Sequence, residues 1–190
     1  MTWFDSLVTR VARIERGVRI ALATACAERC LPVYQALRED ADEGAFTEAI
    51  AVGQRAAETG ERSPARELEL ERRLRTLVED YLDMGYSVLS DAVTVALRVL
   101  QSLDEDESAS ATAVARALAS ALSVADGAEA MMLPPARETS GTFQAEEEAW
   151  QAAAMDLAEG WHGPLRRGMF ASIPPIDGPA WQRRFLASRR

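Results

Sequence analysis

Several side chains with chemical potential lie together in the stretch ACAERCLPVYQAL, residues 25–37. Cys26 and Cys30 could supply two soft thiolate ligands, and Glu28 and Arg29 stand between them. A zinc site needs four ligands, and small apolar thiols are usually core residues. A disulfide between residues four apart on one helix would be strained. We therefore expect both cysteines to be reduced and packed in the core.

The rest of the sequence offers little for catalysis. His162 is the single histidine, and a Cys-His or Ser-His-Asp arrangement would have to recruit it from far along the chain. All 21 basic residues are arginine, which excludes Schiff-base chemistry on lysine. The acidic run at 104–107 lacks the glycine of a calcium loop, and neither a glycine-rich phosphate loop nor a Glu-x-x-His pair occurs. We expect a non-catalytic protein without cofactor or metal.

Pro32 interrupts the helical pattern of this stretch. Inside a helix, proline lacks the donor for the carbonyl of Glu28 and clashes with it, at a cost of about 3 kcal/mol. The sequence predicts either a kink at Leu31 or a new helix that begins with Pro32. Either solution redirects Tyr34. We interpret Pro32 as shaping the chain, with Glu28 and Arg29 pairing to neighbouring helices.

The elements that must position these residues are predicted to be helical almost throughout. Apolar residues recur at spacings of three and four, and no strand-length alternation occurs. The expected helices are one from Phe4 to Val18, one from Leu22 to Leu37, one around 46–53, one from Pro64 with Ser63 as its cap, one at 86–102, an alanine-rich one ending before 133, and one at 143–161. The sequence thus predicts an all-α, single-domain bundle of about seven helices over residues 1–160.

Residues 161–190 form a tail that differs in kind, with frequent prolines and glycines. We expect it to be irregular and to dock on the bundle, because four large aromatic residues are costly to leave in water. These anchors are Trp161, Phe170, Trp181 and Phe185. The alternative is a disordered arm that orders on a partner. Its arginine pairs at 166–167, 183–184 and 189–190 also allow a nucleic-acid role.

Charge is unevenly distributed between these two parts. Residues 1–160 carry a net charge of −14, whereas residues 161–190 carry +5. An acidic body repels nucleic acid and membrane surfaces and attracts basic partners. No run of eighteen apolar residues occurs, and the N-terminus lacks the apolar core of a secretory signal. We expect a cytoplasmic protein that does not enter a membrane.

Three segments also carry a resemblance. ERCLPVY resembles the Glu-Arg-x-x-Pro-x-Tyr motif of a bacterial all-helical family of unknown function, LSDAVTVAL is similar to its mid-chain helix, and EEEAWQAAAMDL to its C-terminal helix. The resemblance covers roughly residues 18–159. It implies structural or binding roles for Glu28, Arg29, Pro32, Tyr34, Asp91, Glu146, Trp150 and Gln151. Ala27 and Val33 depart from the cysteine and asparagine of that family.

The same stretch more weakly resembles the opening of helical immunity proteins from bacterial toxin systems, which bind a cognate toxin. This resemblance and the acidic body favour an immunity-type inhibitor with an acidic binding surface. Its candidate partner-binding residues are Asp104, Glu105, Asp106, Glu107, Glu146, Glu147 and Glu148. One alternative is a small-molecule or metabolic protein with a pocket beside Pro32, formed by Glu28, Arg29, Tyr34 and Asp91. A second is nucleic-acid or scaffold binding through the tail.

Overall fold

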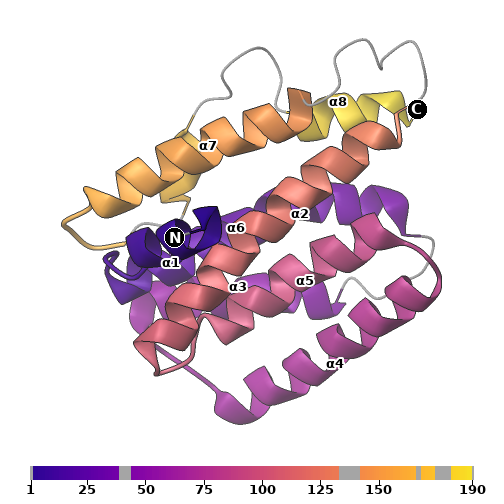
Figure 1. Cartoon of the computed structure of the whole chain (residues 1–190). Coiled ribbons are helices and arrows are strands. Elements are labelled where there is room, and N and C mark those ends of the chain that lie inside the picture. Colours follow the sequence, from indigo (N-terminus) through magenta and orange to yellow (C-terminus); the bar gives the residue numbers. More distant parts are fainter. Residues whose placement is uncertain (1, 39–43, 133–141, 166–167, 174–180, 190) are drawn as a thin grey trace.

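The computed structural model describes residues 2–38, 44–132, 142–165, 168–173 and 181–189, and it is all-helical (Figure 1). The described residues form a packed bundle without strands, which confirms the all-α, single-domain prediction. The elements are α1 Trp3–Val11, α2 Arg16–Leu37, α3 Gly44–Thr59, α4 Pro64–Asp83, α5 Ser87–Gln101, α6 Glu107–Ala130, α7 Thr142–Glu159, the 3-10 turn η2 Met169–Ser172 and α8 Trp181–Ser188. The turn expected at 39–43 and the proline-rich segment at 133–141 lie outside the described residues.

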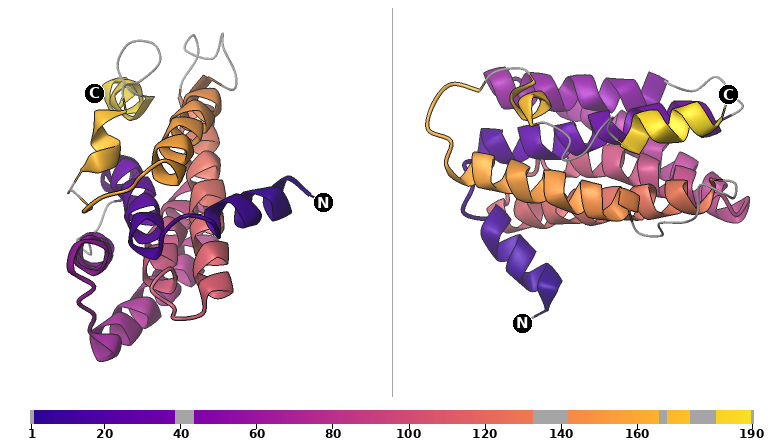
Figure 2. Two further views of the ribbon diagram at one scale, coloured as in Figure 1. Left: turned by 90° about the vertical axis from the view of Figure 1, so that its left-hand side faces the viewer. Right: turned by 90° about the horizontal axis from the view of Figure 1, so that it is seen from above.

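The predicted first helix is wrong in its extent, because α1 ends at Val11 and projects from the body of the bundle (Figure 2). A new helix, α2, begins after Glu15, whose carboxylate accepts hydrogen bonds from the N–H groups of Gly17 at 3.2 Å and Val18 at 3.4 Å. Ile14 lies in the turn between the helices and is buried. The apolar spacing therefore continues through residues that are not helical.

Helix α2 runs through the centre of the bundle and contacts α3, α5, α6, α7 and α8. It is continuous through Pro32, so the prediction of a new helix at that residue is wrong. The carbonyl that loses its donor belongs to Glu28, which is exposed. Water can satisfy that carbonyl there, and this makes the proline tolerable inside the helix.

Close packing in the bundle depends on small residues. Gly53 of α3 lies so close to α2 and α5 that an added Cβ would stand 2.4 Å from both Thr24 Oγ1 and Val99 Cγ1. Helix α6 buries mostly alanines. By length and composition alone α6 could span a membrane, but 56% of its most apolar window is buried in the bundle, as in a core helix.

The tail is more helical than expected, since it contains η2 and α8. Helix α8 packs against α2 and α6, at the end of the bundle where α7 begins (Figure 1). Of the four expected anchors, Phe170, Trp181 and Phe185 are buried and Trp161 is half-buried. The arginine pair at 166–167 and the last residue, 190, lie outside the described residues.

Candidate functional site

An ion pair between the half-buried Arg29 and the fully buried Glu147 joins the first and last segments of the resemblance. Arg29 of α2 donates from Nε at 3.0 Å and from Nη2 at 2.7 Å to the same oxygen, Oε2 of Glu147 in α7. The guanidinium also lies 4.3 Å from the ring centre of Trp150, a cation–π contact. Trp181 of α8 donates its indole N–H to Glu147 Oε2 at 3.0 Å. One carboxylate thereby holds α2, α7 and α8 together.

The second oxygen of Glu147 is also occupied. Gln151 donates to Glu147 Oε1 at 3.4 Å and to the backbone carbonyl of Leu118 in α6 at 2.9 Å. A buried charge is tolerated only when it is paired and hydrogen-bonded, and both conditions are met here. We call Arg29, Glu147, Trp150, Gln151 and Trp181 the Arg29–Glu147 clamp. Its contacts join α2, α6, α7 and α8 and are typical of a structural role.

The expectation that Glu146, Glu147 and Glu148 form one partner-binding surface is corrected by this geometry. Glu147 has no exposed surface. Glu146 forms an ion pair with Arg184 of α8, and Glu148 is exposed and accepts from Gln144 at 3.0 Å. Successive residues of a helix point about 100° apart, so these three carboxylates face different neighbours.

The residues proposed to line a pocket beside Pro32 do not converge. Glu28 accepts a hydrogen bond from Gln54 of α3, on a different side of α2 from the clamp. Tyr34 is buried and stacked on Phe46, with ring centres 4.8 Å apart. Asp91 is half-buried, and burial raises its pKa. Of the three described hollows, one of about 40 Å³ includes Glu28, and none includes Tyr34, Asp91 or Arg29.

The two cysteines are free thiols in the core, as expected. Burial raises the pKa of both Cys26 and Cys30, and the nearby charge of Glu147 raises it further. A neutral buried thiol is a poor nucleophile and a poor metal ligand. Within the described residues, no group of three or more His, Cys, Asp or Glu side chains could hold a metal ion. His162 is exposed, whereas both thiols are buried.

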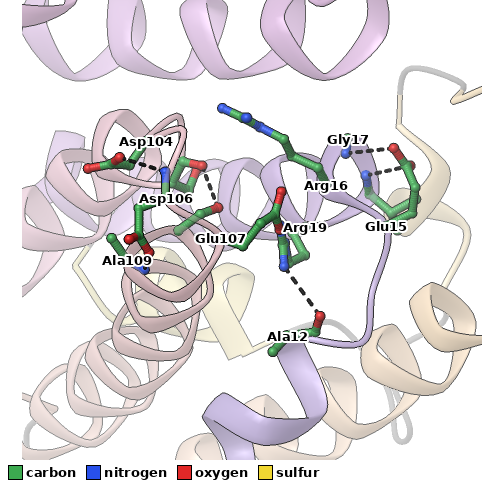
Figure 3. A network of polar contacts seen from close by, with 12 residues as sticks. Ala12, Glu15, Arg16, Gly17, Arg19, Asp104, Asp106, Glu107 and Ala109 are labelled. Carbon is green, nitrogen blue, oxygen red and sulfur yellow. Dashed lines mark hydrogen bonds and ion pairs between the residues drawn. The ribbon is translucent and has the colours of Figure 1, made fainter.

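Residues Asp104 to Asp106 belong to the connection between α5 and α6, Glu107 is the first residue of α6, and all four are exposed. Asp106 caps α6 by accepting from the N–H of Ala109 at 2.8 Å, and Asp104 accepts from the N–H of Asp106 at 2.9 Å (Figure 3). Glu105 makes no hydrogen bond or ion pair with any described residue and faces two surface grooves. We call these four residues the acidic end.

Two arginines that sequence reasoning missed hold the acidic end in place. Arg19 of α2 is buried, pairs with Glu107 and donates to the carbonyl of Ala12 at 3.4 Å (Figure 3). Arg16 donates to the carbonyl of Leu103 at 2.6 Å. Burial, followed by the charge of Arg16, lowers the pKa of Arg19. The available signal was the position of Arg19 between two apolar residues, on the inner side of α2.

The functional candidates thus separate into two sets. Glu147, Trp150 and Gln151 are buried and, with the half-buried Arg29, are engaged with one another between the helices. The acidic end lies on the surface, where its carboxylates can contact a partner. Comparisons of the chain with models of known protein families, with curated proteins and with solved structures find no match.

Proposed function

We propose that this chain is a non-catalytic protein-binding module of the immunity type, which neutralises a basic bacterial toxin by covering it with the acidic end. The observation that carries this proposal is the exposure of four consecutive acidic residues, Asp104, Glu105, Asp106 and Glu107, at the start of α6. Complementary charge speeds association with a basic partner and disfavours wrong partners.

The backbone of the acidic end is fixed before any partner arrives. Asp106 caps α6, and the buried Arg19 forms an ion pair with Glu107. A loop that is already ordered loses little conformational entropy on binding. The carboxylate of Glu105 makes no hydrogen bond or ion pair with a described residue, although the charge of Arg62 lies near it, and it is therefore available to a partner cation. This combination of a fixed frame and an available charge suits a binding surface.

The test is a pull-down with the tagged protein from lysate of the native cells, at low and at high salt, read by mass spectrometry with the neighbouring genes compared. We expect a basic partner that is retained at low salt and released at high salt. Glu105→Arg should weaken its binding at least about tenfold, because the carboxylate becomes a like charge facing the partner.

Glu79→Arg is the matched control. Glu79 is also an exposed glutamate without a described contact, but it lies 15 residues beyond Pro64 along α4, about 22 Å from the end of that helix that faces the acidic end. This control should leave binding unchanged. Equal capture at both salt concentrations, or an equal loss in both variants, would contradict the proposal.

A further inference from the structure

A long groove runs between α4 and α6, over the C-terminal part of α5, with a volume of about 1440 Å³. Both flanking helices pack on α5, which forms the floor. Asp104, Glu105 and Asp106 line its outer end, at the start of α6.

Arg75 of α4 and Arg116 of α6 lie about three turns further along their helices, at the inner end. Arg98, less than one turn before the end of α5, lies near both, since their charges act on it. Arg62 also lines the outer end, where it pairs with Glu67. The groove thus has an excess of negative charge at its outer end and of positive charge at its inner end.

Three arginines from three different helices meet at the inner end: Arg75 of α4, Arg98 of α5 and Arg116 of α6. One carboxylate, that of Glu71, lines the groove beside them. Its Oε1 accepts from Arg75 Nη2 at 2.6 Å and from Gln101 Nε2 at 3.1 Å. Glu71 therefore neutralises Arg75, and the inner end retains the two positive charges of Arg98 and Arg116.

Neither of these two arginines has a carboxylate partner among the described residues. Arg98 donates from Nη1 to Gln101, while its Nε is buried without a hydrogen-bond partner. Arg116 makes no hydrogen bond or ion pair with a described residue. Burial and then the charges of Arg116 and Arg75 lower the pKa of Arg98, and the charge of Glu71 opposes them only in part. Such an arrangement costs stability in the free protein, and an anion would relieve it.

We propose that the inner end of the groove binds the phosphate group of a small phosphomonoester, held chiefly by Arg98 and Arg116. A phosphomonoester carries a charge close to −2 at neutral pH, which matches the two unneutralised guanidinium groups. The planar fork of arginine suits bidentate contact with phosphate oxygens. The two groups come from neighbouring packed helices, so the site needs no folding step to assemble.

The charge of the outer end restricts which chemical groups the ligand can carry beyond its phosphate. The carboxylates of Asp104 to Asp106 would repel a second anionic group, including the next phosphates of a nucleic-acid strand. The remainder of the ligand is therefore neutral or carries an amine. This proposal does not depend on the proposed partner binding, because Arg98 and Arg116 are not part of the acidic end.

Titration calorimetry of the full chain at low ionic strength tests the site, with inorganic phosphate and O-phosphoethanolamine as probes. We expect millimolar or tighter binding of both probes, with the amine-bearing one tighter. Arg98→Gln and Arg116→Gln should each weaken binding at least about tenfold, as expected for loss of a charge-assisted hydrogen bond. Arg55→Gln should not, because the side chain of this exposed arginine of α3 makes no hydrogen bond or ion pair with a described residue.

Thermal unfolding without ligand supplies an independent readout. Arg98→Gln and Arg116→Gln should leave the midpoint unchanged or raise it, because each removes repulsion between like charges. Loss of binding together with unimpaired stability separates a binding role from a structural one. No heat of binding with the native chain, or an equal weakening by Arg55→Gln, would overturn the proposal.

Discussion

At the scale of single residues, burial decides what each charged side chain can do. Glu147 and Arg19 are fully buried, and both are used to hold helices or loops in place. Glu105 and Arg116 are exposed and have no described partner, so they remain available to other molecules. Residue type alone does not separate these cases, because each pair contains one glutamate and one arginine.

Removing the carboxylate of the Arg29–Glu147 clamp should destabilise the protein strongly. Glu147→Ala leaves the guanidinium of Arg29 and the indole N–H of Trp181 without their acceptor. We expect a loss of about 3–5 kcal/mol, the range for breaking one side of a buried pair. Urea unfolding measures it. Glu148→Ala, at the exposed neighbour, should change stability by about 0.5 kcal/mol or less, and similar effects of the two variants would contradict the clamp.

The buried thiols predict a fall in stability at alkaline pH. Burial raises the pKa of Cys26 and Cys30 in the folded state, whereas in the unfolded chain it lies near about 8.5. Above that pH the unfolded state releases both protons and the folded state retains them. The unfolded state then binds fewer protons, so the free energy of unfolding decreases as pH rises toward the folded-state values.

Unfolding in urea at intervals between about pH 7 and pH 10 measures this slope. The chain has no lysine, so few other groups titrate in the lower part of that window. The double variant Cys26→Ala with Cys30→Ala should show a much flatter profile. An unchanged slope in that variant would assign the pH dependence to other groups.

At the scale of helices, the sequence predicted element type well and element ends less well. Apolar spacing located most helices, because each buries one continuous face. It failed at Ile14, which is buried although it lies in a turn and not in a helix. It also failed at Pro32, which α2 tolerates because Glu28 is exposed.

At the candidate site, Phe143 and Trp150, four residues before and three after Glu147, did indicate that it lies on the buried face of α7. What the sequence could not show is its partner, because Arg29 lies 118 residues away in α2.

The close approach of α3 to α2 and α5 predicts that Gly53→Ala is destabilising. The added methyl group would stand 2.4 Å from Thr24 and Val99, two short, branched side chains that cannot swing aside. Overpacking of this kind costs about 1–3 kcal/mol, against about 1 kcal/mol gained in helix propensity. Thermal unfolding should show a lower midpoint. Gly163→Ala, where no atom lies within 4 Å of the added Cβ, should be neutral. If Gly53→Ala raised the midpoint instead, α3 would be able to move away from α2 and α5 without a loss of stability.

At the scale of the whole molecule, the positively charged tail contacts the negatively charged body. The basic tail docks on the acidic body through Arg184 and Glu146, and through the indole of Trp181 on Glu147. Arg189 lies 5.3 Å from the ring centre of Phe185. Part of the positive charge that suggested a nucleic-acid arm is therefore already engaged within the protein. The acidic end, at the start of α6, retains its surface charge.

This arrangement predicts that removing residues 181–190 destabilises the bundle itself. The truncation exposes the contact surface of Trp181 and Phe185, each worth about 1.5–3 kcal/mol when buried, and takes one donor from Glu147. The unfolding midpoint should fall by several degrees. Removing only residues 189–190 takes away two positive charges but no buried aromatic residue, and should leave the midpoint nearly unchanged. If both truncations kept full stability while nucleic-acid retardation was lost in the longer one, the tail would be a binding arm rather than part of the fold.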